Sequence, residues 1–184
     1  MFFKYTDLQN DPTKIGLKKP KANNHPNVIP MQSDQTGVLK GLSEELEEFK
    51  NMTKEERAKS GQNYLTFYSR MRTASLDLEL YDPKNYKGWK NEKLETLARN
   101  AAESFKATGG GQVVFCDRVV SGDGSFNLHD KIKKSLIDHG FKESEIVVVN
   151  GVTKAGGKKS DEAIGREVSA AIDGYNQGKY KVIS

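Results

Sequence analysis

Cysteine and long apolar runs are both scarce in this sequence. It has one cysteine, Cys116, among 184 residues, which excludes a disulfide framework and a zinc site built from cysteines. No apolar run approaches the ~20 residues needed to span a bilayer. The charged residues Lys4 and Asp7 follow the start at once, unlike the apolar stretch of a signal peptide. These absences lead us to expect a soluble, cytoplasmic protein.

A strong excess of one charge sign is also missing. Lysine and arginine number 29 against 25 aspartate and glutamate residues, which gives a net charge of +4. Lysines still gather locally at Lys18, Lys19 and Lys21, at Lys131, Lys133 and Lys134, and at Lys154, Lys158 and Lys159. A basic patch would attract nucleic-acid phosphates, whereas the other interpretation is a solvated, lysine-rich surface. Charge alone favours the second interpretation.

Composition divides the chain into three stretches. Residues 1–32 hold four of the five prolines and few large apolar residues. Because proline lacks a backbone donor and keeps its predecessor extended, we predict an irregular arm that needs another surface to lie on. Residues 33–108 have the patterns of helices, and residues 109–184 alternate between strand and helix patterns.

The stretch 33–108 is predicted to form three helical segments. Ser33 can cap a first helix, whose apolar stripe has helical spacing. After Gly61 the stripe is so broad that we expect the next segment to be buried on several sides. Asn91 is predicted to cap a third helix, which Gly109 ends. The apolar stripe of the first helix is made by Val38, Leu39, Leu42, Leu46 and Phe49.

The last stretch predicts an α/β fold. Short apolar runs at 113–116, 146–149 and 180–183 alternate with helix patterns at 126–139 and 161–177. The runs are continuous rather than alternating, which is typical of strands covered on both faces. This order predicts a parallel sheet with helices on both faces. The residues expected to face inward are Leu128, Ile132, Leu136 and Ile137 in one helix and Ile164, Val168, Ala171, Ile172 and Tyr175 in the other.

The final strand leaves two arrangements open. Either it sits between its neighbours in the sheet, or the chain is the front part of a larger α/β domain. Cys116 ends the first strand and is interpreted as a small core residue, rather than as a nucleophile paired with His129.

Two glycine-containing loops follow the first two strands. Gly151–Ser160 has the composition of a phosphate-binding P-loop, but Gly157 stands where that motif needs its lysine, so we interpret it as a flexible basic loop. Asp117–Ser125 is small and polar and precedes a helix, whose N-terminus can bind an anion. The alternative is that Asp123 and Ser125 only form a turn and cap that helix.

Four segments in order resemble the C-terminal RecA-like lobe of superfamily-two helicases, in the chromatin-remodeller-type branch found in phages and mobile elements. They are YSRMRTASLDLELYDP (68–83), GQVVFCDRVV (111–120), IVVVNGVT (146–153) and VSAAIDGYNQGKYKVIS (168–184). Two features depart from the family. Arg166 stands nine residues before Tyr175, where the family has an arginine about seven residues before its Phe-Asn pair. The last two signature blocks and the whole first lobe, with its P-loop, are absent from this chain.

The resemblance implies a partial RecA-like lobe from a DNA helicase or translocase, with a helical region and an extended arm before it. Such a fragment would bind nucleic-acid phosphates weakly and without sequence preference. It would not hydrolyse ATP, because the family's ATP and Mg²⁺ are held largely by the absent parts. It would pair with the missing helicase lobe or self-associate. The residues that would contact phosphates are Arg118, Ser121, Gly122, Ser125, Asn127, Asn150, Gly151 and Thr153.

One alternative belongs to a different class of protein. The chain could be a stand-alone protein–protein interaction module that retains the α/β scaffold and binds partners through its helical region. An enzyme with a small active site of its own is a third hypothesis, but the sequence holds no clear acid–base or nucleophile constellation.

Overall fold

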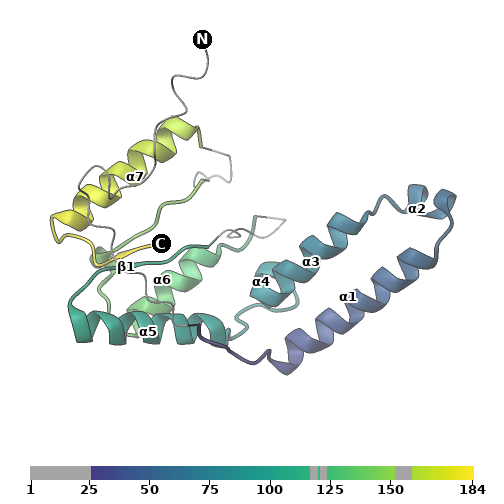
Figure 1. The fold of residues 1–184 in the computed structure, drawn as a ribbon, viewed down its shortest axis with the longest axis horizontal. Helices are drawn as coiled ribbons and strands as arrows, with labels where there is room; N and C mark the ends of the chain where they lie inside the picture. The colour runs from purple at the N-terminus through teal and green to yellow at the C-terminus, as the bar shows by residue number, and fades with distance from the viewer. Residues whose placement is uncertain (1–25, 117–119, 121–123, 152–158) are drawn as a thin grey trace, which may run out of the picture.

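The computed structural model of the chain describes residues 26–116, 120, 124–151 and 159–184. In these residues, helices α5, α6 and α7 surround a small sheet, and a pair of long helices, α1 and α3, extends away from it (Figure 1). None of the described helices is both long and apolar enough to cross a membrane.

The extended region is a helical hairpin. It consists of α1 (Ser33–Asn51), α2 (Lys54–Ser60), α3 (Tyr64–Leu76) and the single turn α4 (Leu78–Tyr81). Helices α1 and α3 lie side by side (Figure 1), and Leu46 and Phe49 of α1 meet Phe67 of α3 in a buried cluster. At the tip, Thr53 and Glu56 form a reciprocal capping box that starts α2.

Two predictions for this hairpin were wrong. Ser33 is the first residue of α1, and the cap position is Gln32, whose side chain accepts no capping hydrogen bond. The segment after Gly61 is not buried on several sides, since Tyr64, Leu65 and Tyr68 are 40 %, 78 % and 57 % exposed. The reason is that α3 packs mainly against α1 and α4, so only one side of its broad stripe is covered.

The third predicted helix is confirmed. Helix α5 (Glu92–Thr108) begins after Asn91, whose side-chain oxygen accepts from the backbone N–H of Lys93 at 3.0 Å and of Leu94 at 3.4 Å. It ends at Gly109, which has φ +66°. Only glycine adopts this left-handed conformation readily, so the helix stops there.

The sheet is parallel and has the order β1-β3-β2. Its elements are β1 (Gln112–Val113), α6 (Leu128–Asp138), the 3-10 turn η3 (Glu143–Glu145), β2 (Ile146–Val147), α7 (Asp161–Asn176) and β3 (Val182–Ile183). Gln112 and Ile146 both lie opposite Val182. The last strand therefore sits between its neighbours. This is the first of the two arrangements that the sequence left open. The predicted α/β class agrees with this small parallel sheet in a mostly helical chain.

Helices α5 and α6 cover one face of the sheet and α7 lies on the other (Figure 1). The main core lies on the α5 and α6 side, and it is formed by Leu80, Leu94, Ala98, Ala101, Ala102, Leu128, Ile132, Leu136, Phe141, Ile146 and Val182. Cys116 packs against this core, which supports its interpretation as a small core residue.

Three residues predicted to face inward are partly exposed: Ile137, Val168 and Ile172, at 38 %, 40 % and 47 %. The buried residues of α7 are Ala171, as predicted, and Gly174, which was not predicted. Small residues are required there because the sheet side approaches closely: a Cβ on Gly174 would lie 2.4 Å from the Tyr180 ring. The larger residues of α7 consequently point away from this contact.

Among the described residues, the first strand is covered on one face only, whereas its pattern predicts cover on both. Val114 and Cys116 pack against the main core. Val113 and Phe115, which alternate with them, are 52 % and 92 % exposed.

Candidate nucleic-acid interface

Residues 117–127 and 150–160, which we call the strand-end segments, follow β1 and β2, whose carboxyl ends lie at the same edge of the parallel sheet. Helices α6 and α7 each follow such a segment. Of the predicted phosphate-contacting residues, the structure describes Ser125, Asn127, Asn150 and Gly151. Arg118, Ser121, Gly122 and Thr153 lie outside the described residues, as does Asp123, one of the two suggested caps.

Asn127 is the N-cap of α6. Its side-chain oxygen accepts from the backbone N–H of His129 at 3.0 Å, and the residue forms an isolated antiparallel bridge with Val120. The cap of α6 is therefore Asn127 rather than Ser125. Its carboxamide oxygen stabilises the helix, so a phosphate at this end would be bound through N–H groups.

The two described ends of the second segment are joined by a hydrogen bond. The carbonyl of Gly151 accepts from the backbone N–H of Lys159 at 2.9 Å, and Ser160 then caps α7 by accepting from the N–H of Ala163 at 3.2 Å. Lys159 Nζ is paired with Glu167 at 2.7 Å. The end of β2 and the start of α7 are thus held together, with the positive end of the helix dipole at the strand-end edge.

His129 connects the start of α6 to the end of β3. Its Nδ1 lies 2.9 Å from Ser184 Oγ, and the side chains of both residues are buried. Burial lowers the pKa of His129 below its usual value, while the nearby Asp130 carboxylate opposes this shift. A buried, neutral imidazole contributes to the packing of this edge and not to phosphate binding.

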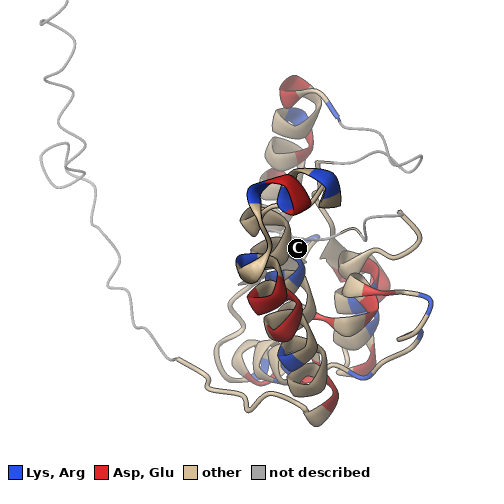
Figure 2. Ribbon diagram, turned by 90° about the vertical axis from the view of Figure 1, so that its right-hand side faces the viewer, with Lys and Arg blue, Asp and Glu red and all other residues tan. Residues whose placement is uncertain are grey.

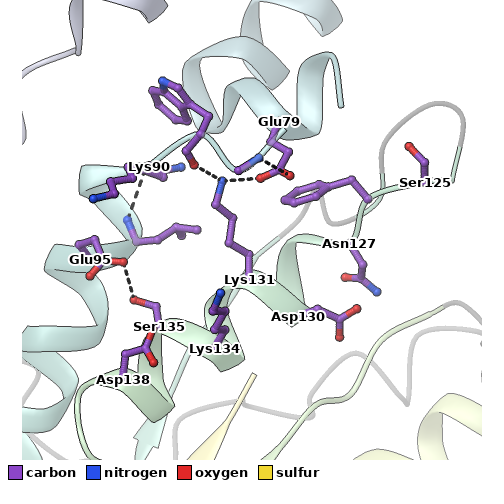
Figure 3. Close-up of a pocket in the computed structure, with 15 residues that line it drawn as sticks. Glu79, Lys90, Glu95, Ser125, Asn127, Asp130, Lys131, Lys134, Ser135 and Asp138 are labelled. Atoms are coloured by element: carbon purple, nitrogen blue, oxygen red, sulfur yellow. Dashed lines mark hydrogen bonds and ion pairs between the residues drawn. The ribbon is translucent and has the colours of Figure 1, made fainter. Parts of the chain in front are cut away.

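The sequence analysis missed a polar cluster beside this edge (Figure 3). Lys131 Nζ lies 3.0 Å from Asp77 Oδ2 and 3.1 Å from Glu79 Oε2, and it donates to the carbonyl of Trp89 at 2.6 Å. The rings of Trp89 and Phe126 flank the same ammonium at 5.7 and 5.4 Å. Lys131 is therefore fully occupied by partners within the chain.

This cluster lies in a hollow of about 570 Å³ between α5 and α6, and Ser125 and Asn127 belong to its lining. Lys134, which is exposed, also lines it and points into the hollow in Figure 3. No local pattern could signal the cluster, because 42 to 54 residues separate Lys131 from its three partners. Ser125 and Asn127 thus lie between this hollow and the strand-end edge.

The rest of the described surface carries charges of both signs, with lysines recurring at Lys84, Lys87, Lys90 and Lys93. Basic and acidic residues are intermixed along the helices (Figure 2), and several are paired, such as Lys40 with Glu44 and Arg70 with Glu45. Among the described residues, no group of three or more histidine, cysteine, aspartate or glutamate side chains is placed to hold a metal ion.

Comparisons with known proteins add no further identification. No family model, curated protein or solved structure matches this chain.

Proposed function

We propose that this chain binds the phosphates of one nucleic-acid strand at the carboxyl edge of its sheet. In this proposal it is a partial RecA-like lobe of a DNA helicase or translocase that does not hydrolyse ATP by itself. The supporting observation is that helices α6 and α7 both begin after strand-end segments, capped by Asn127 and Ser160. Backbone N–H groups and helix dipoles at such positions favour a phosphate.

The basic residues of the strand-end segments would add to this attraction. Arg118 follows the first strand, and Lys154 and Lys158 follow the second. Because these basic residues are few, the contacts would be few. The segments from 117 to 127 and from 150 to 160 contain no aromatic residue besides Phe126, and Phe126 packs against the main core. Binding would accordingly depend on phosphates and not on stacked bases.

Fluorescence anisotropy of a labelled single-stranded oligonucleotide tests this proposal. We expect weak binding of similar strength on every sequence, with a log–log salt slope of about −0.7 per phosphate neutralised. Four contacts would weaken binding roughly 50-fold between 50 and 200 mM salt.

The matched pair of variants for this assay is Arg118→Ala and Lys40→Ala. Lys40 is an exposed lysine of α1 whose nearest acidic partner, Glu44, lies 3.9 Å away. Arg118→Ala should weaken binding on every sequence, and Lys40→Ala should leave it nearly unchanged. Equal losses, or no binding at 50 mM salt, would reject the nucleic-acid proposal.

One observation favours the alternative of a protein–protein interaction module. Tyr64, Leu65 and Tyr68 form an exposed apolar surface near the start of α3, and the hairpin extends away from the sheet (Figure 1). Aromatic residues are enriched at protein interfaces. Leu65→Asp distinguishes the two functions, because it should abolish binding to a protein partner and leave the oligonucleotide affinity unchanged.

A further inference from the structure

The outer face of β1 is an apolar surface that no described part of the chain covers. Phe115 is 92 % exposed and Val113 is 52 % exposed. Because Val114 and Cys116 pack on the core, strand alternation directs Val113 and Phe115 to the opposite side of the sheet. The continuous apolar run of this strand is typical of a strand covered on both faces, yet the described residues cover only one face.

Helix α7 also carries exposed apolar residues. It lies on the same side of the sheet (Figure 1), and its residues Val168 and Ile172 are 40 % and 47 % exposed. The two are four positions apart, so they share one face of the helix. Together with Val113 and Phe115 they define what we call the open face.

The edge of the sheet beside the open face is also unpaired among the described residues. The backbone N–H groups of Gln112 and Val114 donate to the carbonyls of Lys181 and Ile183 in or beside β3, both at 2.8 Å. The intervening N–H groups of Val113 and Phe115 therefore point away from β3. An added extended segment could pair with them, as in β-strand addition.

The N-terminal arm already reaches this edge. Asn27 and Ile29 line a groove of about 510 Å³ together with residues 112–115 and α5. Gln32 fixes the arm there: its side chain donates to the Lys90 carbonyl at 3.1 Å and accepts from the Glu92 N–H at 3.2 Å. The chain that precedes Pro26 therefore starts at the groove.

The charge balance of residues 1–25 is opposite in sign to that of α7. It carries five lysines against two aspartates, whereas α7 carries four acidic residues against the single basic Arg166. At ~3.3 Å per extended residue, the segment is long enough to cross the small sheet. Its large apolar residues are Met1, Phe2, Phe3, Tyr5, Leu8, Ile15 and Leu17.

We propose that residues 1–25 of the same chain cover the open face, with their apolar residues against Phe115, Val113 and the exposed side of α7. A tethered segment has an effective concentration in the millimolar range. It therefore outcompetes a second copy of the chain at ordinary protein concentrations. With residues 1–25 in this position, β1 would be covered on both faces, as its sequence pattern predicts.

A photo-crosslinker at the open face tests this occupant in the full chain. Benzoylphenylalanine is placed at position 115, and crosslinked peptides are identified by mass spectrometry in a mixture of ¹⁴N- and ¹⁵N-labelled protein. We expect crosslinks to residues 1–25 within one molecule, with a yield that does not depend on protein concentration. Crosslinks between labelled and unlabelled molecules would show that a second copy covers the face. Absence of crosslinks to residues 1–25 would show that these residues do not cover it. Either result overturns the proposal.

Two controls accompany the crosslinking. The same crosslinker at Leu65, 78 % exposed on α3, should give no crosslink to residues 1–25. The second control is an arm variant that combines Phe2→Ser, Phe3→Ser, Ile15→Ser and Leu17→Ser. This variant should lose the position-115 crosslink, and its amide hydrogens at residues 113 and 115 should exchange faster. Val28→Ser, at a residue 91 % exposed, should change neither readout. Unchanged amide exchange in the four-residue variant would also overturn the proposal.

Discussion

Lys131 Nζ lies 3.0 Å from Asp77 Oδ2, and this contact joins helix α6 to the start of α4. The Asp77 side chain is fully buried. Its other oxygen caps α4 by accepting from the Leu80 N–H at 3.1 Å, and Asn91 Nδ2 donates to Oδ2 at 2.6 Å. The Lys131 ammonium therefore links α6 to the start of α4. Through Asp77 and Asn91 it also links α6 to the start of α5.

Lys131→Met should destabilise the protein strongly. The substitution keeps an unbranched side chain that is one atom shorter, but it leaves the Asp77 carboxylate buried without its counter-charge, which costs about 3–5 kcal/mol. Denaturant unfolding followed by circular dichroism measures this loss. Lys133→Met is the control, because Lys133 pairs with the exposed Glu143, and surface ion pairs contribute little. Equal stability of the Lys131→Met variant and the wild type would show that the cluster does not hold the two parts together.

Two glycines of α7 should respond in opposite directions to alanine. A Cβ on Gly174 would meet the Tyr180 ring at 2.4 Å, so Gly174→Ala should destabilise by about 1–3 kcal/mol through overpacking. A Cβ on Gly165 would meet no neighbour within 4 Å, and Gly165→Ala should stabilise the helix by about 0.5–1 kcal/mol. Thermal melts of both variants measure these changes. A stabilising Gly174→Ala would contradict the close approach of α7 to Tyr180.

Stability should fall on mild acidification because of His129. Burial lowers its folded-state pKa, so the neutral ring is favoured in the native state. The stabilisation is complete above the unfolded-state pKa of about 6.5 and is lost as the pH falls below that value toward the lower folded-state pKa. His129→Gln should remove this part of the pH dependence, measured as the urea midpoint between pH 7.5 and 5. Parallel profiles for the two proteins would assign the dependence to other groups.

The sequence predicted local features better than tertiary ones. The cap at Asn91 and the glycine end at Gly109 were predicted correctly, because both depend on residues within one turn of the helix. The central position of β3 was one of two alternatives, since strand order depends on contacts that periodicity does not report. The exposed face of α3 was missed because the width of an apolar stripe does not tell how many neighbours a helix has.

The candidate site shows the same limit. Asn127 was predicted only as a phosphate-contacting residue, and Ser125 was suggested as the cap; the capping role of Asn127 emerges only from the hydrogen bond to His129. Lys131 appeared in the sequence as one member of a surface lysine cluster, whereas it lies between two carboxylates and two aromatic rings. Its partners come from distant parts of the chain, and a local pattern cannot pair them.

The central claim is that phosphates bind where α6 and α7 begin. The most direct test is a ¹H–¹⁵N correlation spectrum of the full chain, titrated with a single-stranded oligonucleotide at 50 mM salt. We predict that the backbone amide signals of residues 125–129 and 159–163 shift together, with one binding constant that weakens as salt is added. Shifts confined to other lysine-bearing surfaces, such as residues 84–93, or a spectrum without shifts would contradict the claim.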